Sequence, residues 1–274
     1  MSKRLKIGIV GCGAIGSSLA KFITKGLSRQ AQISALYDIN PLKNKRLSKS
    51  VSKNKGLAVK SLEALIAGSG LIIEAASAAS SWEIARRALS KGRDVMIMST
   101  GGVAGRLKEL SALAKKNNAK VYIPSGAISG VDALKAAKLG RIKNVTLTTR
   151  KSPESFKGVK YLEERRINLA NMQKETLLFY GPAKEAVRYF PQNINVAAVL
   201  SLAGIGQDKT MVKLIASPEV KRNIHEIKIE SASGDITTRT ENILHPDNPK
   251  TSFLAVLSAM ETLRQILEPV RIGT

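Results

Sequence analysis

The sequence predicts an α/β protein with an N-terminal doubly wound parallel sheet, followed by an α+β domain whose sheet is mixed or antiparallel. Short apolar runs alternate with helical stretches up to roughly residue 140, which is typical of parallel strands joined by right-handed crossovers. Beyond that point, alternation of polar and apolar residues favours half-exposed antiparallel strands. We expect the first domain over residues 1–125 and the second over residues 126–274.

The first predicted strand and helix are joined by a glycine motif. The run LKIGIV predicts a strand, and GCGAIG then places Gly11, Gly13 and Gly16 on the spacing G-x-G-x-x-G. In dinucleotide-binding folds these glycines allow a tight turn, close approach of the phosphates and close packing of the helix. Ala14 and Ile15 begin the helix, where free N–H groups attract phosphate. We expect these five residues to bind the cofactor, although a purely structural turn is the alternative.

An acidic residue follows the next predicted strand, AQISALYDIN. Asp38 lies roughly 20 residues beyond the motif, where a dinucleotide fold places an acid for the adenosine ribose hydroxyls. Its charge disfavours a 2′-phosphate, while Lys43, Lys45 and Arg46 partly neutralise that effect. We therefore expect NAD to be used and NADP to be accepted as well.

Small residues end the later strands of the first domain, in the segments EAAS, STGG and PSGA. Because the carboxyl ends of parallel strands meet at one edge of the sheet, these segments favour a cofactor groove there. Together with the glycine motif and Asp38, they predict a Rossmann domain.

The second domain contains both predicted strands and predicted helices. The strand-like segments are NVTLTTRK, ETLLFYG, TMVKLIA, NIHEIKIES and DITTRTE, and the helical ones are PAKEAVRYF and NVAAVLSLAG. The final segment predicts a long amphipathic helix over about residues 251–269 that packs back towards the first domain.

Composition limits the classes of protein that fit. The net charge of +23 attracts anions, but the basic residues are scattered and aromatic residues make up 4% of the chain, so no specific nucleic-acid partner is expected. No apolar run reaches the length of a membrane span and no signal peptide is evident, so we expect a cytoplasmic protein. Cys12 is the single cysteine, which excludes an intrachain disulfide and a multi-cysteine metal site, and no metal is expected.

Two histidines are candidates for acid–base chemistry. His225 lies within a predicted strand, and His245 precedes a proline and the predicted last helix, where a capping role is natural. Spacing alone does not choose between them. Candidate carboxylate contacts are Arg150, next to Lys151 at a strand end, and the segment NPKTS with Lys250 and Thr251, which we expect to open the last helix.

Several segments resemble the L-aspartate dehydrogenase family, and the resemblance covers nearly the whole chain. The matching segments are GCGAIG, YIPSGAISGVDAL, LTTRK, FPQNINVAAVLSLAG, NIHEIKI, NPKTS and the terminal IGT. This resemblance implies a Rossmann domain, a mixed α/β catalytic domain and a homodimer. It also implies oxidation of L-aspartate with NAD or NADP to iminoaspartate, which yields oxaloacetate and ammonium or feeds NAD biosynthesis.

The resemblance also implies roles for single residues. Ala127 in SGA and Asn195 in NINV correspond to nicotinamide-side contacts, and His225 in NIHEI corresponds to the catalytic histidine. Gly102 in STGG departs from the family, which often has alanine there. The rival enzymes are relatives of homoserine dehydrogenase or dihydrodipicolinate reductase, whose own lysine or histidine patterns are not found in the second domain. A non-catalytic protein that senses NAD or binds nucleic acid is the rival of another class.

Overall fold

The computed structural model describes residues 4–52, 55–170, 172–190, 195–246 and 248–273. The chain divides into two compact units, each with its own sheet. The first unit is Met1–Pro124 with Val256–Arg271, and the second is Ser125–Ala255 with Ile272–Thr274. A parallel sheet in the first unit and a mixed sheet in the second confirm the predicted fold class.

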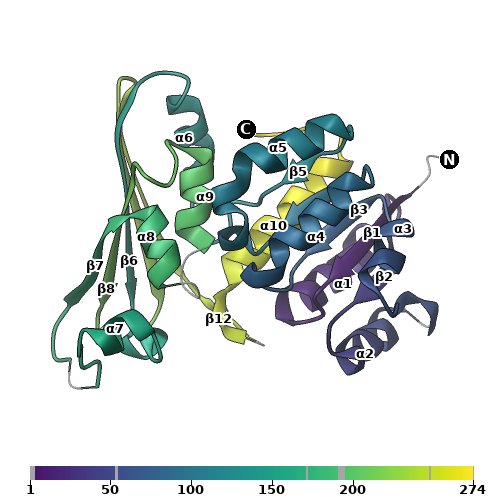
Figure 1. The fold of residues 1–274 in the computed structure, drawn as a ribbon, viewed down its shortest axis with the longest axis horizontal. Helices are drawn as coiled ribbons and strands as arrows, with labels where there is room; N and C mark the ends of the chain where they lie inside the picture. The colour runs from purple at the N-terminus through teal and green to yellow at the C-terminus, as the bar shows by residue number, and fades with distance from the viewer. Residues whose placement is uncertain (1–3, 53–54, 171, 191–194, 247, 274) are drawn as a thin grey trace. The chain divides into compact units, whose positions relative to one another are not determined.

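The first unit contains a five-stranded parallel sheet in the order β2-β1-β3-β4-β5 (Figure 1). Its strands are β1 (Leu5–Val10), β2 (Ala31–Tyr37), β3 (Leu71–Glu74), β4 (Asp94–Ile97) and β5 (Val121–Tyr122). The chain leaves β1 towards β2 and later returns to the other side of β1 with β3. This reversal makes the carboxyl ends of β1 and β3 the switch point at which such sheets bind ligands.

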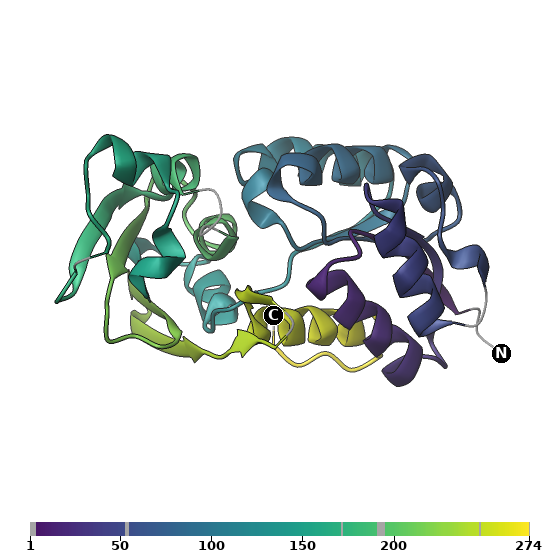
Figure 2. The same cartoon turned by 90° about the horizontal axis from the view of Figure 1, so that it is seen from below.

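Helices cover both faces of this sheet (Figure 2). They are α1 (Ala14–Gly26), α2 (Pro41–Val51), α3 (Leu62–Ala67), α4 (Ala78–Ser90), α5 (Leu107–Lys116) and α10 (Phe253–Leu267), with short 3-10 helices η1 (Lys55–Leu57), η2 (Thr100–Gly102) and η3 (Ala104–Arg106). One apolar core joins α1, α2 and α10 to the sheet, and a second joins α3, α4 and α5. Burial on both faces explains why these strands are almost continuously apolar in sequence.

The second unit contains a five-stranded mixed sheet in the order β10-β9-β6-β8-β7. Its strands are β6 (Ile142–Lys151), β7 (Thr176–Pro182), β8 (Thr210–Ala216), β9 (Asn223–Ser231) and β10 (Gly234–Asn242). The central strand β6 runs parallel to β8 and antiparallel to β9. The helices are α6 (Val131–Ala137), α7 (Lys160–Glu164), α8 (Ala183–Tyr189) and α9 (Asn195–Ala203), with the 3-10 helix η4 (Pro153–Phe156).

The helices of the second unit lie along one face of its sheet (Figure 1). On the central strand, Val145, Leu147, Thr149 and Lys151 project to one face and are all buried, while Thr148 on the other face is buried as well. Across the sheet, Leu147 pairs with Ile227 and Thr149 pairs with His225. Paired residues project to the same side. His225 therefore lies on the same face as this buried row.

The structure corrects one prediction about the C-terminal region. Lys250 and Thr251 belong to a strand, β12 (Asn248–Ser252), which pairs with β11 (Leu244–His245), and α10 begins only at Phe253. The sequence pattern missed this pair because each strand is short and the pairing follows a turn at Pro246. Within the described residues, no helix is long and apolar enough to cross a membrane.

Candidate functional site

The glycine motif forms a tight turn between β1 and α1. Gly11 has a φ of +95°, and a Cβ on it would collide with the carbonyl oxygen of Ala75 at the end of β3. A Cβ on Gly16 would collide with the carbonyl oxygen of Gly11, so the helix packs directly on the turn. A Cβ on Gly13 would meet no atom within 4 Å. Gly11 and Gly16 are thus required by the fold, whereas Gly13 leaves open space in front of the turn.

The first turn of α1 faces this open space with uncapped backbone groups. Gly13 is the N-cap residue, and no side-chain hydrogen bond caps the helix. The first turn, which begins with Ala14 and Ile15, contains no acidic residue. Free N–H groups and the positive end of the helix dipole make this turn suitable for a phosphate.

Asp38 lies just beyond β2 and connects to the glycine turn. Its Oδ2 accepts a hydrogen bond from the backbone N–H of Cys12 at 2.7 Å, and its Oδ1 accepts one from the N–H of Asn40 at 2.9 Å. Each carboxylate oxygen has a second lone pair for a further donor. The carboxylate is therefore fixed in place and can still accept a ribose hydroxyl.

A groove of about 580 Å³ lies at this carboxyl edge of the first unit. We call it the dinucleotide groove; among its lining residues are Gly11, Gly13, Asp38, Lys43, Lys60 and Ala76. Its volume falls in the range of small-molecule sites. The uncapped helix turn, the open position at Gly13 and the fixed carboxylate fit the phosphates and ribose of a dinucleotide.

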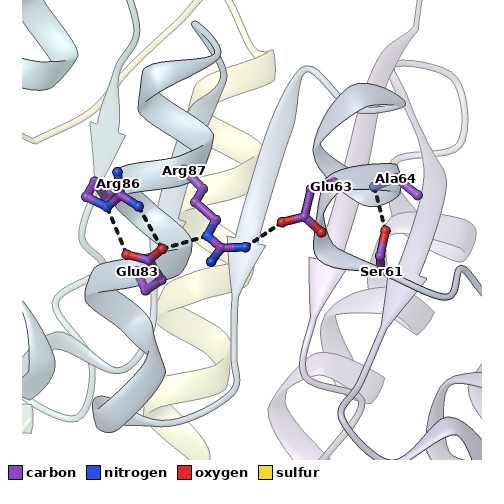
Figure 3. A network of polar contacts seen from close by, with 6 residues as sticks. All are labelled: Ser61, Glu63, Ala64, Glu83, Arg86 and Arg87. Carbon is purple, nitrogen blue, oxygen red and sulfur yellow. Dashed lines mark hydrogen bonds and ion pairs between the residues drawn. The ribbon is translucent and has the colours of Figure 1, made fainter.

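Glu63, Glu83 and Arg87 line this groove, and ion pairs among them join two helices (Figure 3). Arg87 on α4 binds Glu63 on α3 and, from its Nε, Glu83 at 2.6 Å. Arg86 also binds Glu83, at 2.7 Å, and the two arginines lower the pKa of Glu83 to about 2. The charged residues that line the groove thus belong to a network that links α3 to α4.

Buried Glu74 joins two of the predicted small-residue segments. At the end of β3, it accepts hydrogen bonds from the backbone N–H groups of Ala76 (2.8 Å) and Ser99 (2.9 Å) and from the Ser99 hydroxyl (2.9 Å). Burial raises the pKa of Glu74, while these hydrogen bonds lower it. Sequence reasoning placed Glu74 at a strand end without finding this role.

The candidate catalytic residue of the second unit is His225. Its side chain is 3% exposed, and its Nδ1 lies 2.9 Å from Oγ1 of Thr149. If Nδ1–H donates to Thr149, Nε2 is left as the acceptor. Burial, together with the charge of Lys151, lowers the pKa of His225 to about 3. The ring is therefore neutral near pH 7, and the near-neutral pKa that is usual for histidine does not hold here.

Lys151 is the charged neighbour of His225. It ends β6 two residues after Thr149, on the same buried face, and its side chain is also largely buried at 9% residue exposure. Burial lowers the pKa of Lys151 to about 8. We call Thr149, Lys151 and His225 the histidine face.

A loop of the second unit carries Ala127. Gly126 precedes it with a φ of +72°. The buried Ala127 accepts hydrogen bonds at its carbonyl oxygen from Thr240 Oγ1 at 3.2 Å and Asn242 Nδ2 at 2.9 Å. Thr240 pairs with His225 across the sheet, so β10 connects this loop to the strand of the histidine. Neither Thr240 nor Asn242 was found by sequence reasoning, because their contacts are distant in the chain.

The remaining candidates are distributed over the second unit. Asn195 is the exposed first residue of α9. Arg150 is paired with Ile224 in the sheet, on the opposite side from the histidine face, and its guanidinium lies 3.5 Å from Glu175 and 4.0 Å from Glu226. The structure thus does not bring Arg150 together with His225.

The C-terminal candidates lie around the β11–β12 pair. The hydroxyl of Thr251 accepts a hydrogen bond from Asn248 Nδ2 at 3.0 Å, and the side chain of Lys250 is outside the described residues. His245 is buried, and its ring makes an edge contact with Phe253 at 5.6 Å. His245 is therefore packed against its neighbours and does not occupy the loop or capping position that the sequence predicted.

Comparisons with known proteins cover both units. A family model described as "Aspartate dehydrogenase, C-terminal" matches residues 132–266, and one described as "Homoserine dehydrogenase, NAD binding domain" matches residues 11–124. L-aspartate dehydrogenases of Methanosarcina barkeri and Methanosarcina acetivorans are 47% and 48% identical, over 98% of this chain and 100% of theirs. The crystal structure of aspartate dehydrogenase from Thermotoga maritima is 27% identical, covers 99% of this chain and 100% of its own, and has a TM-score of 0.75.

Proposed function

The chain belongs to the L-aspartate dehydrogenase family, and on this premise we propose that it oxidises L-aspartate with NAD(P) to iminoaspartate. Water then converts the imine to oxaloacetate and ammonium. The observation that carries the proposal is the match of the aspartate dehydrogenase model over residues 132–266, which include the whole histidine face. The rival readings, homoserine dehydrogenase, dihydrodipicolinate reductase and a non-catalytic protein, are not favoured by this match.

The first unit binds the cofactor in this proposal. The chain uses NAD(P), whose nicotinamide supplies the hydride acceptor when it is bound. The first turn of α1, with Gly13, Ala14 and Ile15, would hold the pyrophosphate, and Asp38 would accept hydrogen bonds from the adenosine ribose. Since a carboxylate repels a 2′-phosphate, we expect NAD to be preferred and NADP to be accepted.

His225 orients the amino group of the substrate. Loss of a hydride from the α-carbon requires a neutral amine, because the nitrogen lone pair must become the new C=N bond. A neutral imidazole, with Nδ1 fixed by Thr149, presents Nε2 as an acceptor for an amine N–H. The same nitrogen can then accept a hydrogen bond from the water that attacks the imine.

The loop before α6 would contact the nicotinamide side of the cofactor. Ala127 and Asn195 are the residues that the family resemblance implies there. The carbonyl oxygen of Ala127 already accepts two hydrogen bonds from β10. Thr240 and Asn242 thus act as positioning residues that hold this loop relative to the strand of His225.

A direct assay tests the proposed activity. L-aspartate and NAD are mixed with the protein, and the absorbance of the reduced cofactor is followed over time. We expect reduction with L-aspartate, and none with L-homoserine or D-aspartate as matched controls. Reduction with L-homoserine but not with L-aspartate would overturn the proposal.

We further propose that the enzyme acts as a homodimer in the cytoplasm. The family resemblance supports the dimer, and a reaction on L-aspartate and NAD(P), two small water-soluble metabolites, supports the location. Light scattering on a sizing column would give twice the 29.4 kDa chain mass for a dimer. Cell fractionation checks the location.

A further inference from the structure

Two neighbouring cations at the end of β6 project to opposite sides of the second sheet. Arg150 pairs with Ile224, while Thr149, one residue earlier, pairs with His225. Successive residues in a strand alternate between faces. Lys151 therefore shares the face of Thr149 and His225, whereas Arg150 is directed to the other face.

Arg150 and Lys151 also differ in their surroundings. Arg150 lies near the carboxylates of Glu175 and Glu226, which offset its charge. Lys151 is largely buried, and this burial lowers its pKa to about 8. Its ammonium group also acts on the ring of His225, because its charge contributes to the lowered pKa of that histidine.

We propose that Lys151 holds a carboxylate of the amino-acid substrate beside His225. This inference rests on the proposed function and names the substrate contact within the same site. The α-amino and α-carboxylate groups of an amino acid share one carbon atom, so the groups that recognise them must be neighbours. A neutral imidazole suits the amine and an ammonium suits the carboxylate, and the histidine face places both on one surface.

Binding of a carboxylate beside Lys151 should change the protonation of this lysine. A carboxylate bound beside Lys151 favours the ammonium form, so the bound lysine is fully protonated at pH 8. With a pKa of about 8, Lys151 is about half protonated at that pH before substrate binds, so binding takes up about half a proton. Of the described groups on its face, His225 titrates near pH 3 and does not contribute at pH 8. Arg150 and Glu226 lie on the other face.

Steady-state kinetics provide the first test. Lys151→Met keeps the length of the side chain and removes the charge; we expect the apparent KM for L-aspartate to rise about 10- to 100-fold, the range for a lost charge-assisted hydrogen bond. The KM for NAD should stay within roughly twofold. Lys228→Met, an exposed lysine on β9 that lies on the other face, is the matched control and should behave as wild type. A KM for L-aspartate within roughly threefold of wild type in Lys151→Met overturns the proposal.

Calorimetry with succinate, a dicarboxylate without an amine, provides a test that does not depend on turnover. The protein with NAD is titrated at pH 8 in two buffers of different ionisation enthalpy, which reports proton uptake. We expect uptake in the wild type and none in Lys151→Arg, because a guanidinium is always protonated. Equal uptake in the wild type and in Lys151→Arg, or equal affinity for succinate in the wild type and in Lys151→Met, overturns the proposal. If the wild type binds succinate but does not oxidise L-aspartate, the proposed function fails while the lysine subsite stands.

Discussion

The dinucleotide groove is built mostly from backbone atoms, whereas the histidine face is built from side chains on neighbouring strands. In the groove, glycines and an uncapped helix turn define the space, and Asp38 is held by two backbone N–H groups. On the histidine face, burial and the nearby charge of Lys151 keep the ring of His225 neutral, and a hydrogen bond with Thr149 holds it in place. Cofactor binding in the groove should therefore be weakened by a side chain that fills its space. Activity at the histidine face should be lowered by a substitution that removes a hydrogen-bonding or charged group.

The largest expected effect comes from the histidine face. His225→Ala should lower kcat by roughly 10²- to 10⁴-fold, the usual range for a positioned acid or base, with little change in NAD affinity. His245→Ala is the matched control: it removes a buried ring and should cost about 1–3 kcal/mol of unfolding free energy, with turnover near normal. Near-normal turnover in folded His225→Ala, with loss of turnover in His245→Ala, would reverse the assignment.

A pair of glycine variants separates binding from folding in the groove. Gly13→Val puts a side chain into open space, so we expect NAD affinity to fall about 100-fold while the melting temperature changes little. Gly16→Ala forces a methyl group against the turn and should lower the melting temperature instead. Fluorescence titration with NADH and thermal melts measure the two effects. Equal losses of stability in both variants would contradict this division of roles.

The preference for NAD over NADP tests the role of Asp38 in the dinucleotide groove. Asp38→Asn removes the charge that repels a 2′-phosphate and keeps an oxygen for the N–H of Cys12, while Lys43 and Lys60 remain nearby. We expect the ratio of kcat/KM for NAD over NADP to fall by roughly tenfold. The wild type itself should not prefer NADP; a preference above about a hundredfold, nearly 3 kcal/mol, would show that Asp38 is wrongly assigned.

The smallest effect is a pH dependence of stability. Because the pKa of His225 falls from 6.5 to about 3 on folding, the unfolded chain binds a proton between these values that the folded chain does not. Stability from this group is thus complete above pH 6.5 and decreases as the pH falls towards 3. Between pH 6.5 and about 5.5 the wild type should lose about 1 kcal/mol more than His225→Gln in denaturant unfolding. Identical losses would mean that the ring is protonated in the folded protein.

The sequence predicts a region well where the contacting residues lie close together along the chain, and poorly where they lie far apart. The glycine turn, α1 and Asp38 lie within a short stretch of chain, so spacing alone predicted a turn between a strand and a helix and an acid after the next strand; their contacts with the cofactor stay a prediction. The partners of His225 come from β6, far away in sequence, and its pKa depends on burial that a single strand does not reveal. Which of the two cations, Arg150 or Lys151, lies on the same face as His225 could be decided only from the register of β6 against β9. The strand at Lys250 and Thr251 was missed because its partner, β11, consists of two residues.

Cys12 has a practical consequence that follows from its place in the glycine turn. It is the single cysteine of the chain, it is buried, and burial together with the charge of Asp38 raises the pKa of its thiol to about 12. Since the thiolate is the reactive species, maleimide dyes and mild oxidants should leave it unmodified at neutral pH. A cysteine introduced on the surface of each unit would therefore be labelled selectively in the otherwise wild-type chain. Fluorescence energy transfer between two such labels could follow the distance between the units while the enzyme turns over.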